Sequence, residues 1–144
     1  MEVRIEPAHA DDLPAIESLL EHSGLPRAEI ERHLGAAVVA RAGSQLVGSA
    51  AVELYGPAGL LRSVAVAAEQ RGQGLGRRLT NAALELARRR GVRHLYLLTE
   101  TAGEFFPRFG FRTIPRTAVA PAVQQSIEFT RACPDSALAM VTEL

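Results

Sequence analysis

The spacing of apolar and polar positions divides the first quarter of the chain into short elements. Residues 3–5 alternate and predict a short first strand. A helix follows, because apolar residues three and four apart share one face after Asp11, which offers an N-cap, and residues 22–24 end it. A second short helix is expected from about Pro26 to Leu34.

Three apolar stretches come next, at 36–41, 45–55 and 60–66. Turn signals separate them: residues 42–44 read Ala-Gly-Ser, and residues 56–59 read Gly-Pro-Ala-Gly. Loops this short join antiparallel strands. We therefore expect a meander of three strands.

The second half of the chain alternates helices with strands. An amphipathic helix begins near Leu75 and is closed by Gly91 in the C′ position, before a strand at 94–99. Joining the strand at 60–66 to this one through a helix requires a parallel crossover. The remaining expected elements are a short helix at 105–109, a strand at 111–114, a helix at 119–131 and a last strand at 137–141.

This order of elements predicts an α/β (α+β) fold: a mixed, mostly antiparallel sheet of about six to seven strands, flanked by helices. One domain is expected over residues 1–144, since two would leave each with roughly 70 residues, too few for a good core. A hydrophobic content of 47% with 22% charged residues excludes a disordered chain.

Composition also indicates the cellular location and whether a disulfide or a metal site is expected. The sequence has neither a membrane-spanning apolar run nor a secretory leader, so we expect a cytoplasmic protein that does not bind membranes. The single Cys133 forms neither an internal disulfide nor a zinc site, and we expect it to pack. No metal is expected.

Charge is balanced overall but unevenly placed. All sixteen basic residues are Arg, against sixteen acids. Seven of them lie from Arg71 to Arg93 with Glu85 as the only acid there, so this segment carries about +6 and the rest about −6. Such a stretch in a neutral protein favours a small anionic ligand over nucleic acid. The alternative is a solvated helix face.

A glycine-rich loop carries the clearest functional signal. Arg71-Gly72-Gln73-Gly74-Leu75-Gly76 follows the strand at 60–66 and opens the long helix. Its glycines let backbone N–H groups approach a ligand, and a helix N-terminus suits a pyrophosphate. A P-loop is excluded because the chain has no Lys. A dinucleotide-binding loop fits poorly, because several antiparallel strands come first.

The loop, preceded by Val64-Ala65-Val66, resembles the Arg/Gln-x-x-Gly-x-Gly motif of the GCN5-related N-acetyltransferase (GNAT) family. Residues 105–111 resemble the family's aromatic–aromatic–x-x-x-Gly-Phe element, and the resemblance extends along nearly the whole chain. It implies the GNAT fold, with the sheet splayed between strands four and five. It also implies acetyl-CoA as cosubstrate.

The resemblance assigns backbone groups to the cosubstrate. The backbone of Val64 and Val66 is expected to pair with pantetheine, and the N–H groups from Gly72 to Arg77 to hold the pyrophosphate. The expected acetyl-CoA-binding residues are Val64, Ala65, Val66, Arg71, Gly72, Gln73, Gly74, Leu75, Gly76 and Arg77.

One aromatic position departs from the family pattern. Many members have Tyr as the second aromatic, where its hydroxyl protonates the leaving thiolate, and Phe106 stands there in this chain. An Asn common on the preceding loop is also missing from residues 99–102. Tyr55, Tyr96 or water are the alternative donors, and unassisted departure of the thiolate is another alternative.

The amine must lose a proton before it attacks, so a base is expected near the thioester. Glu53, alone among apolar neighbours in 45–55, is the first candidate, with a solvated edge position as its alternative. Glu100, at the end of the strand at 94–99, is the second.

Polar residues near the expected acetyl position are the candidates for holding the acceptor. Arg62 interrupts an apolar run and is expected to clamp a substrate carboxylate, unless it lies on a surface face of the strand. Ser63 and Thr99 are expected beside the substrate, although Ser63 could instead bond the backbone.

Two further stretches narrow the resemblance. Residues 95–106 look like amino-acid N-acetyltransferases related to N-acetylglutamate synthase. Residues 61–66, with the tail from Glu128 to Met140, look like small acetyltransferases associated with arsenic-resistance operons. The implied substrate is the primary amine of a small carboxylate- or oxyanion-bearing molecule, an amino acid or an arsenic- or phosphorus-containing analogue. The implied mechanism is direct attack in a ternary complex.

The alternatives are an acetyltransferase for a protein N-terminus or side-chain amine, and a non-catalytic acetyl-CoA sensor. No nucleic-acid partner is expected. Family members often pair through their C-terminal strands, which implies a homodimer.

Overall fold

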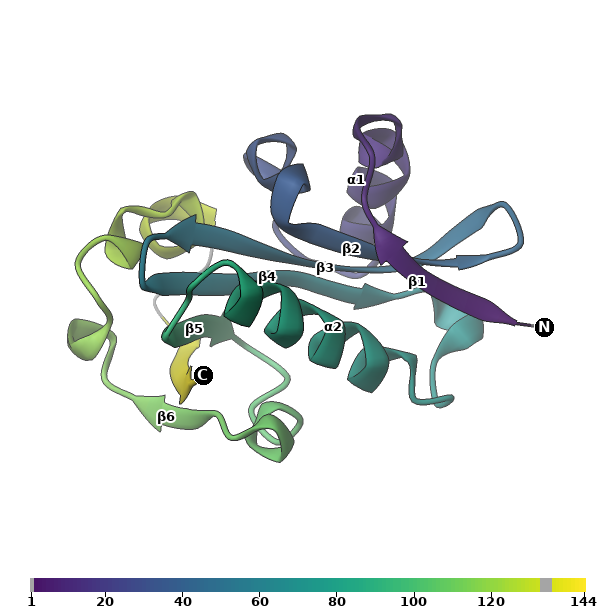
Figure 1. Cartoon of the computed structure of the whole chain (residues 1–144). Coiled ribbons are helices and arrows are strands. Elements are labelled where there is room, and N and C mark those ends of the chain that lie inside the picture. Colours follow the sequence, from purple (N-terminus) through teal and green to yellow (C-terminus); the bar gives the residue numbers. More distant parts are fainter. Residues whose placement is uncertain (1, 133–135) are drawn as a thin grey trace.

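Seven strands form one mixed sheet in the computed structural model, which describes residues 2–132 and 136–144. Their order across the sheet is β1-β2-β3-β4-β5-β7-β6 (Figure 1). The strands are β1 (Val3–Pro7), β2 (Ala37–Ala42), β3 (Gln45–Tyr55), β4 (Ala58–Val66), β5 (His94–Thr99), β6 (Arg112–Ile114) and β7 (Leu138–Glu143). The predicted fold class is confirmed. Cys133 lies outside the described residues.

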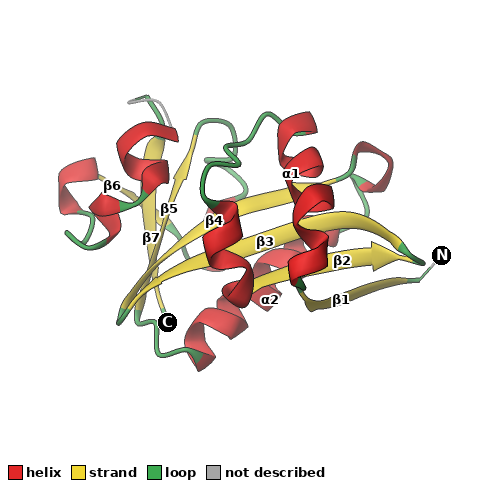
Figure 2. Ribbon diagram, turned by 90° about the horizontal axis from the view of Figure 1, so that it is seen from above, coloured by secondary structure: helices red, strands yellow, loops and turns green. Residues whose placement is uncertain are grey.

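Two α-helices cover opposite faces of this sheet (Figure 2): α1 (Leu13–His22) on one and α2 (Leu75–Arg89) on the other. Residues of β2 alternate between them, since Val38 packs in the core with α2 and Val39 in the core with α1. The other helical segments are Ala10–Asp12, Ile30–Ala36, Ala68–Gln70, Phe106–Phe109, Arg116–Ala118, Val123–Gln125 and Glu128–Ala132. Within the described ranges, no helix is long and apolar enough to cross a membrane.

Helix α2 approaches the sheet closely at β3. A Cβ atom on Gly48 would lie 2.7 Å from Leu79 Cδ1, so the helix packs at this distance because residue 48 has no side chain. Full burial of one Leu side chain contributes about 1.5–3 kcal/mol. The helix ends as predicted, because Gly91 adopts φ +85 and its N–H donates to the Arg88 carbonyl at 3.1 Å.

Strands β4 and β5 run parallel but separate part-way. Pairing covers Ala58–Leu61 against His94–Leu97. Beyond it, the β3–β4 register shifts between Ser49 and Ala51, which inserts an extra residue into β4, and Ser63 there adopts φ +60. A bulge of this kind bends the strand that contains it. The predicted splay between the fourth and fifth strands is thus confirmed.

Two predicted features near the N-terminus are wrong in detail. The chain already turns at Ala10, so Asp11 lies inside a helical turn and caps nothing. Asp12 instead accepts the His9 N–H at 2.8 Å. The second helix begins at Ile30, four residues later than predicted, because the preceding Glu29 has a left-handed backbone (φ 59) that no helix accommodates.

The helix predicted over 119–131 is broken. Val123–Gln125 and Glu128–Ala132 are separate turns, and Ser126 between them is extended, with φ −58 and ψ 144. The Ser126 hydroxyl accepts the Glu128 N–H at 3.1 Å, which replaces a helical backbone bond. The apolar spacing of this segment therefore predicted its burial but not its local structure.

Candidate active site

The separation of β4 from β5 leaves a cavity of about 370 Å³, which we call the splay cavity. One wall is β4 from Leu61 to Val66, and the other is residues 97–102, where β5 ends. Figure 2 shows the two strands diverging. Phe105 and Phe106 also line the cavity, with their rings edge to face at 5.1 Å. The cavity is therefore bounded by strand backbone and by an aromatic pair.

The glycine-rich loop reaches this cavity through Arg71 and Gly76. Gly72 and Gly74 adopt φ +82 and +79, and a Cβ atom on either would meet nothing within 4 Å. Among the described residues, no backbone carbonyl accepts the N–H groups from Gly72 to Arg77. Open space, available N–H groups and the N-terminus of α2 together fit a phosphate group.

The edge of β4 that faces the cavity also has available peptide groups. Ala67 N–H donates to the Val47 carbonyl at 2.8 Å, so the alternating Val64 and Val66 turn their peptide groups away from β3 and toward the cavity. The Val66 carbonyl accepts Arg71 Nε at 3.1 Å. An extended chain that contains amides fits such an edge as an added strand.

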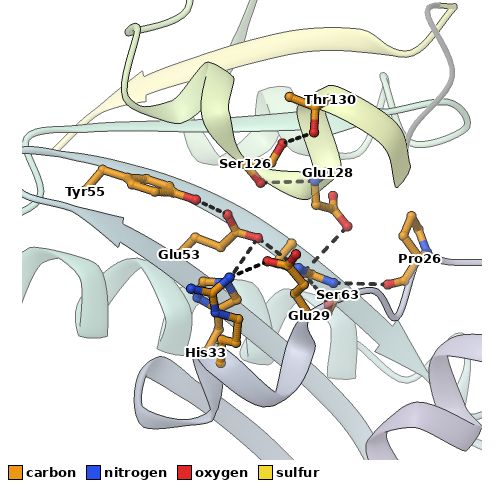
Figure 3. A network of polar contacts seen from close by, with 11 residues as sticks. Pro26, Glu29, His33, Glu53, Tyr55, Ser63, Ser126, Glu128 and Thr130 are labelled. Atoms are coloured by element: carbon orange, nitrogen blue, oxygen red, sulfur yellow. Dashed lines mark hydrogen bonds and ion pairs between the residues drawn. The ribbon is translucent and has the colours of Figure 1, made fainter.

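A buried guanidinium lies on the β4 wall. Arg62 is 3% exposed, which rules out the surface-face alternative. Its Nη1 donates to Glu53 Oε2 at 2.8 Å, its Nη2 to the Pro26 carbonyl at 3.3 Å and its Nε to Ser63 Oγ at 3.1 Å (Figure 3). Glu128 Oε2 lies 3.6 Å from Nε. A buried charge needs such partners, because each ion lost its hydration on folding.

Glu53 is not among the described residues that line the splay cavity. It is 1% exposed, so the solvated-edge alternative is wrong. It accepts the Tyr55 hydroxyl, and His33 Nε2 lies 3.5 Å from its Oε2. Burial raises the pKa of Glu53, but hydrogen bonds from Ser126, Tyr55 and Arg62 outweigh it and leave that pKa below its usual value. The carboxylate is therefore ionised and held tightly against Arg62.

A second cavity, of about 470 Å³, lies on the Glu53 side of this ion pair, and Tyr55, His33 and Ser126 line it. Burial lowers the pKa of His33, and the charge of Glu53 opposes part of that effect. Burial and the bond to Glu53 raise the pKa of Tyr55 to about 12. The Tyr55 hydroxyl thus stays protonated at neutral pH and donates away from the splay cavity.

No tyrosine among the described residues that line the splay cavity replaces the hydroxyl missing at Phe106. Tyr96 packs in a separate core cluster with Leu60 and Val141, and Tyr55 bonds to Glu53. Hydroxyl groups do line the cavity, among them those of Ser63 and Thr99.

Ser63, Thr99 and Glu100 all line the splay cavity. Ser63 sits in the β4 bulge next to Arg62. Thr99 Oγ1 accepts the Ala102 N–H at 2.9 Å and so holds the loop after β5. Glu100 is exposed where β5 ends.

Sequence reasoning missed three residues of this cluster: His33, Ser126 and Glu128. Each comes from a different part of the chain than Arg62, and the last two lie in the segment predicted to be helical. The available signal was a carboxylate placed between two apolar residues, Ile127 and Phe129. Buried acids of this kind need a partner, which is the reason to suspect a site.

Comparison with known proteins identifies the family. The profile of the family "Acetyltransferase (GNAT) domain" matches residues 33–113, more than half of the chain. This chain belongs to the GNAT acetyltransferase family. The match includes β2 to β5, the glycine-rich loop, α2 and the aromatic segment, which contain the features described above.

Individual relatives show which members of the family the chain resembles. An amino-acid acetyltransferase of Neisseria meningitidis is 31% identical over 120 residues, which cover 77% of this chain and 28% of the relative. N-acetylglutamate synthase from Neisseria gonorrhoeae, complexed with coenzyme A and N-acetyl-glutamate, superposes with a TM-score of 0.84 at 25% identity, over 100% of this chain and 35% of the other. The chain thus spans about a third of the length of these proteins.

A protein of similar length shares the fold. Rv2747 from Mycobacterium tuberculosis, in complex with CoA and NLQ, gives a TM-score of 0.83 at 23% identity, over 98% of this chain and 99% of that one. The neisserial synthase and the mycobacterial protein were both solved with CoA.

Proposed function

We propose that the protein transfers the acetyl group of acetyl-CoA to the primary amine of a small substrate that carries a carboxylate or another oxyanion. The observation that carries this proposal is the splay cavity, which opens beside a glycine-rich helix N-terminus and reaches the buried Arg62. A thioester whose pantetheine arm joins a small acyl group to a pyrophosphate matches that shape.

Backbone groups bind the cosubstrate in this proposal. The N–H groups from Gly72 to Arg77 hold the pyrophosphate, and Gln73, Leu75 and Arg71 complete the loop around it. The peptide groups of Val64, Ala65 and Val66 pair with the pantetheine. The acetyl group then lies near Ser63 and Thr99, because these line the part of the cavity beside Arg62.

Side chains bind the acceptor. A guanidinium has five N–H donors, and the contacts of Arg62 with Glu53, Pro26 and Ser63 use three of them. The other N–H groups are assigned to the acceptor's carboxylate or oxyanion. We assign Glu53 the task of positioning Arg62, since its pKa is lowered and it lies behind that residue. Glu100 remains a candidate base at the cavity mouth.

The thiolate leaves without a tyrosine. A free thiol has a pKa of about 8.5, so its anion is a tolerable leaving group at neutral pH. Its proton comes from water or from the attacking nitrogen.

The substrate class follows from the relatives and from the tail. Amino-acid acetyltransferases favour an α-amine beside a carboxylate, and the resemblance of residues 61–66 and the tail to arsenic-operon acetyltransferases extends the class to phosphinic and arsinic amino acids. A cytoplasmic location and a homodimer remain predictions.

The test is mass-spectrometric detection of acetyl transfer from acetyl-CoA to a pooled panel of amino acids, including L-glutamate and its phosphinic and arsinic analogues. We expect one product heavier by one acetyl group. Tight binding of acetyl-CoA without any product would contradict the proposal and favour either a protein amine as the acceptor or the acetyl-CoA sensor. The missing hydroxyl at Phe106 is the observation that supports the sensor.

A further inference from the structure

Glu128 is a second buried carboxylate beside Arg62, and unlike Glu53 it lines the splay cavity. It is 4% exposed. In the sequence, Glu128 has a place in the tail but no catalytic or binding role. Its position on the cavity wall places a carboxylate where a bound substrate would lie.

The backbone of the tail fixes Glu128 in place. Its N–H donates to Ser126 Oγ at 3.1 Å, and Thr130 Oγ1 donates to the Ser126 carbonyl at 3.0 Å. Two hydrogen bonds to Ser126 therefore hold the turn that carries Glu128. Figure 3 shows the Glu128 carboxylate pointing from this turn toward the β4 wall. A carboxylate held by a folded turn reaches its partner with little loss of side-chain entropy.

Glu53 and Glu128 share one guanidinium but differ in what they face. Glu53 lies 2.8 Å from Arg62 Nη1, and Tyr55 and His33 contact it on the side of the second cavity. Glu128 lies 3.6 Å from Arg62 Nε, on the wall of the splay cavity. The wall therefore presents a cation and an anion side by side. This pair is complementary to the carboxylate and the ammonium group of an amino acid.

We propose that Glu128 binds the ammonium group of the acceptor and accepts its first proton. The proposal rests on the acetyltransferase function above. One proton passes from the ammonium nitrogen to the Glu128 carboxylate, which leaves a neutral amine. The amine nitrogen then bonds to the thioester carbon, the carbon–sulfur bond breaks, and the electron pair goes to sulfur. The nitrogen's second proton neutralises the thiolate, and Glu128 returns its own proton to water.

Burial favours Glu128 over Glu100 for this task. An ammonium–carboxylate contact is stronger away from bulk water, and Glu100 is exposed. Glu128 also lies beside Arg62, so one ligand of amino-acid size reaches both groups.

The first test measures binding without turnover. The probes are L-glutamate and glutarate, which differ by the ammonium group, titrated calorimetrically into protein saturated with CoA. We expect the unaltered protein to prefer L-glutamate by about tenfold or more, and Glu128→Gln to lose that preference. Glu143→Gln, on the exposed side of β7, is the matched control and should keep it. A preference that survives in Glu128→Gln, or is missing from the unaltered protein, overturns the ammonium site.

The second test follows acetylation of L-glutamate against pH. Glu128→Gln should lower kcat/KM about 100-fold at neutral pH, and its rate should climb with pH as free amine forms, because the amine then needs no base. CoA affinity should stay unchanged. A Glu128→Gln profile parallel to that of the unaltered protein overturns the base role, and a loss confined to Glu100→Gln assigns the role to Glu100.

The two tests separate the two proposals. Absence of transfer to every amine of the panel overturns the proposed transfer to a small amine and the base role of Glu128. The calorimetric preference for L-glutamate over glutarate still tests the ammonium site. If Glu128→Gln does not fold, Glu128→Asp decides: it keeps a carboxylate one methylene further back, so kcat should fall while the preference for L-glutamate remains. Loss of that preference in a folded Glu128→Asp overturns the proposal.

Discussion

The two ends of the splay cavity are built in opposite ways. At the loop end, the groups that fit a phosphate are backbone N–H groups from six consecutive residues, Gly72 to Arg77, at the start of one helix. At the Arg62 end, the polar groups are side chains from β3, β4, the helical turn at Ile30–Ala36 and the segment at 123–130. The first end is a local motif, and the second exists only when four segments meet.

The difference shows how each end tolerates change. A backbone site depends on the absence of side chains and on positive φ angles, so a change of side chain outside those positions leaves it intact. A side-chain site in a buried network depends on every partner, because each lost partner leaves another group unsatisfied. Substitutions should therefore harm the loop end through binding and the Arg62 end through stability as well.

The largest expected effect is at the Arg62 end. Arg62→Met leaves the Glu53 and Glu128 carboxylates without this guanidinium, and breaking a buried ion pair costs about 3–5 kcal/mol in the free energy of unfolding, measurable by urea denaturation. Adding Glu53→Gln should restore part of the loss. The control Arg112→Met breaks an exposed pair with Glu143 and should cost less than about 1 kcal/mol. Equal losses in both variants would mean that the buried network contributes nothing special.

At the loop end, Gly74→Trp should reduce CoA affinity by about 100-fold, or about 2.7 kcal/mol, because an indole would fill the open space above the loop. Calorimetry with CoA measures it. Gly43→Trp is the matched control: Gly43 also has a positive φ and open space, but it lies in the β2–β3 turn. Both variants should lose roughly 1–2 kcal/mol of stability to backbone strain. Unchanged CoA affinity in Gly74→Trp would remove the loop from the site.

The aromatic side of the cavity should respond more weakly. Phe106→Tyr adds the hydroxyl that many GNAT members have, and we expect kcat to rise about tenfold. This is less than a general acid usually provides, because the attacking nitrogen or water already supplies the proton. The control Phe109→Tyr changes a ring outside the described lining of the cavity. A kcat that is unchanged in Phe106→Tyr would show that protonation of the thiolate does not limit the rate.

The smallest effect is a change in pH dependence. Because burial holds the pKa of His33 below its ordinary 6.5, the unfolded chain binds this proton more readily than the folded one. The contribution of His33 to stability is therefore complete above about pH 6.5 and is lost as the pH falls below it. His33→Gln should flatten the fall in unfolding free energy in that window, as measured by urea denaturation at several pH values. Parallel curves for the two proteins would contradict it.

The sequence alone determined the elements that depend on local rules. The strand meander, the crossover helix with Gly91 at its C′ position and the glycine-rich loop all follow from spacing and from backbone geometry, and they fixed the fold and the loop end of the site. Where local and tertiary preferences conflicted, the spacing of apolar residues did not predict the secondary structure. Residues 119–131 have the apolar pattern of a helix, yet the segment breaks at Ser126.

Only the tertiary structure decided the Arg62 end. The sequence singled out Glu53 and Arg62 as polar residues in apolar strands, but it left a solvated edge and a surface face open as alternatives. Only the packed sheet shows that both side chains are buried on one face and pair with each other. Nor could the sequence bring Glu128 to the same guanidinium, since the two lie 66 positions apart and no periodic pattern links them. Backbone sites are local in sequence because one peptide follows another, whereas buried charge networks are assembled by packing.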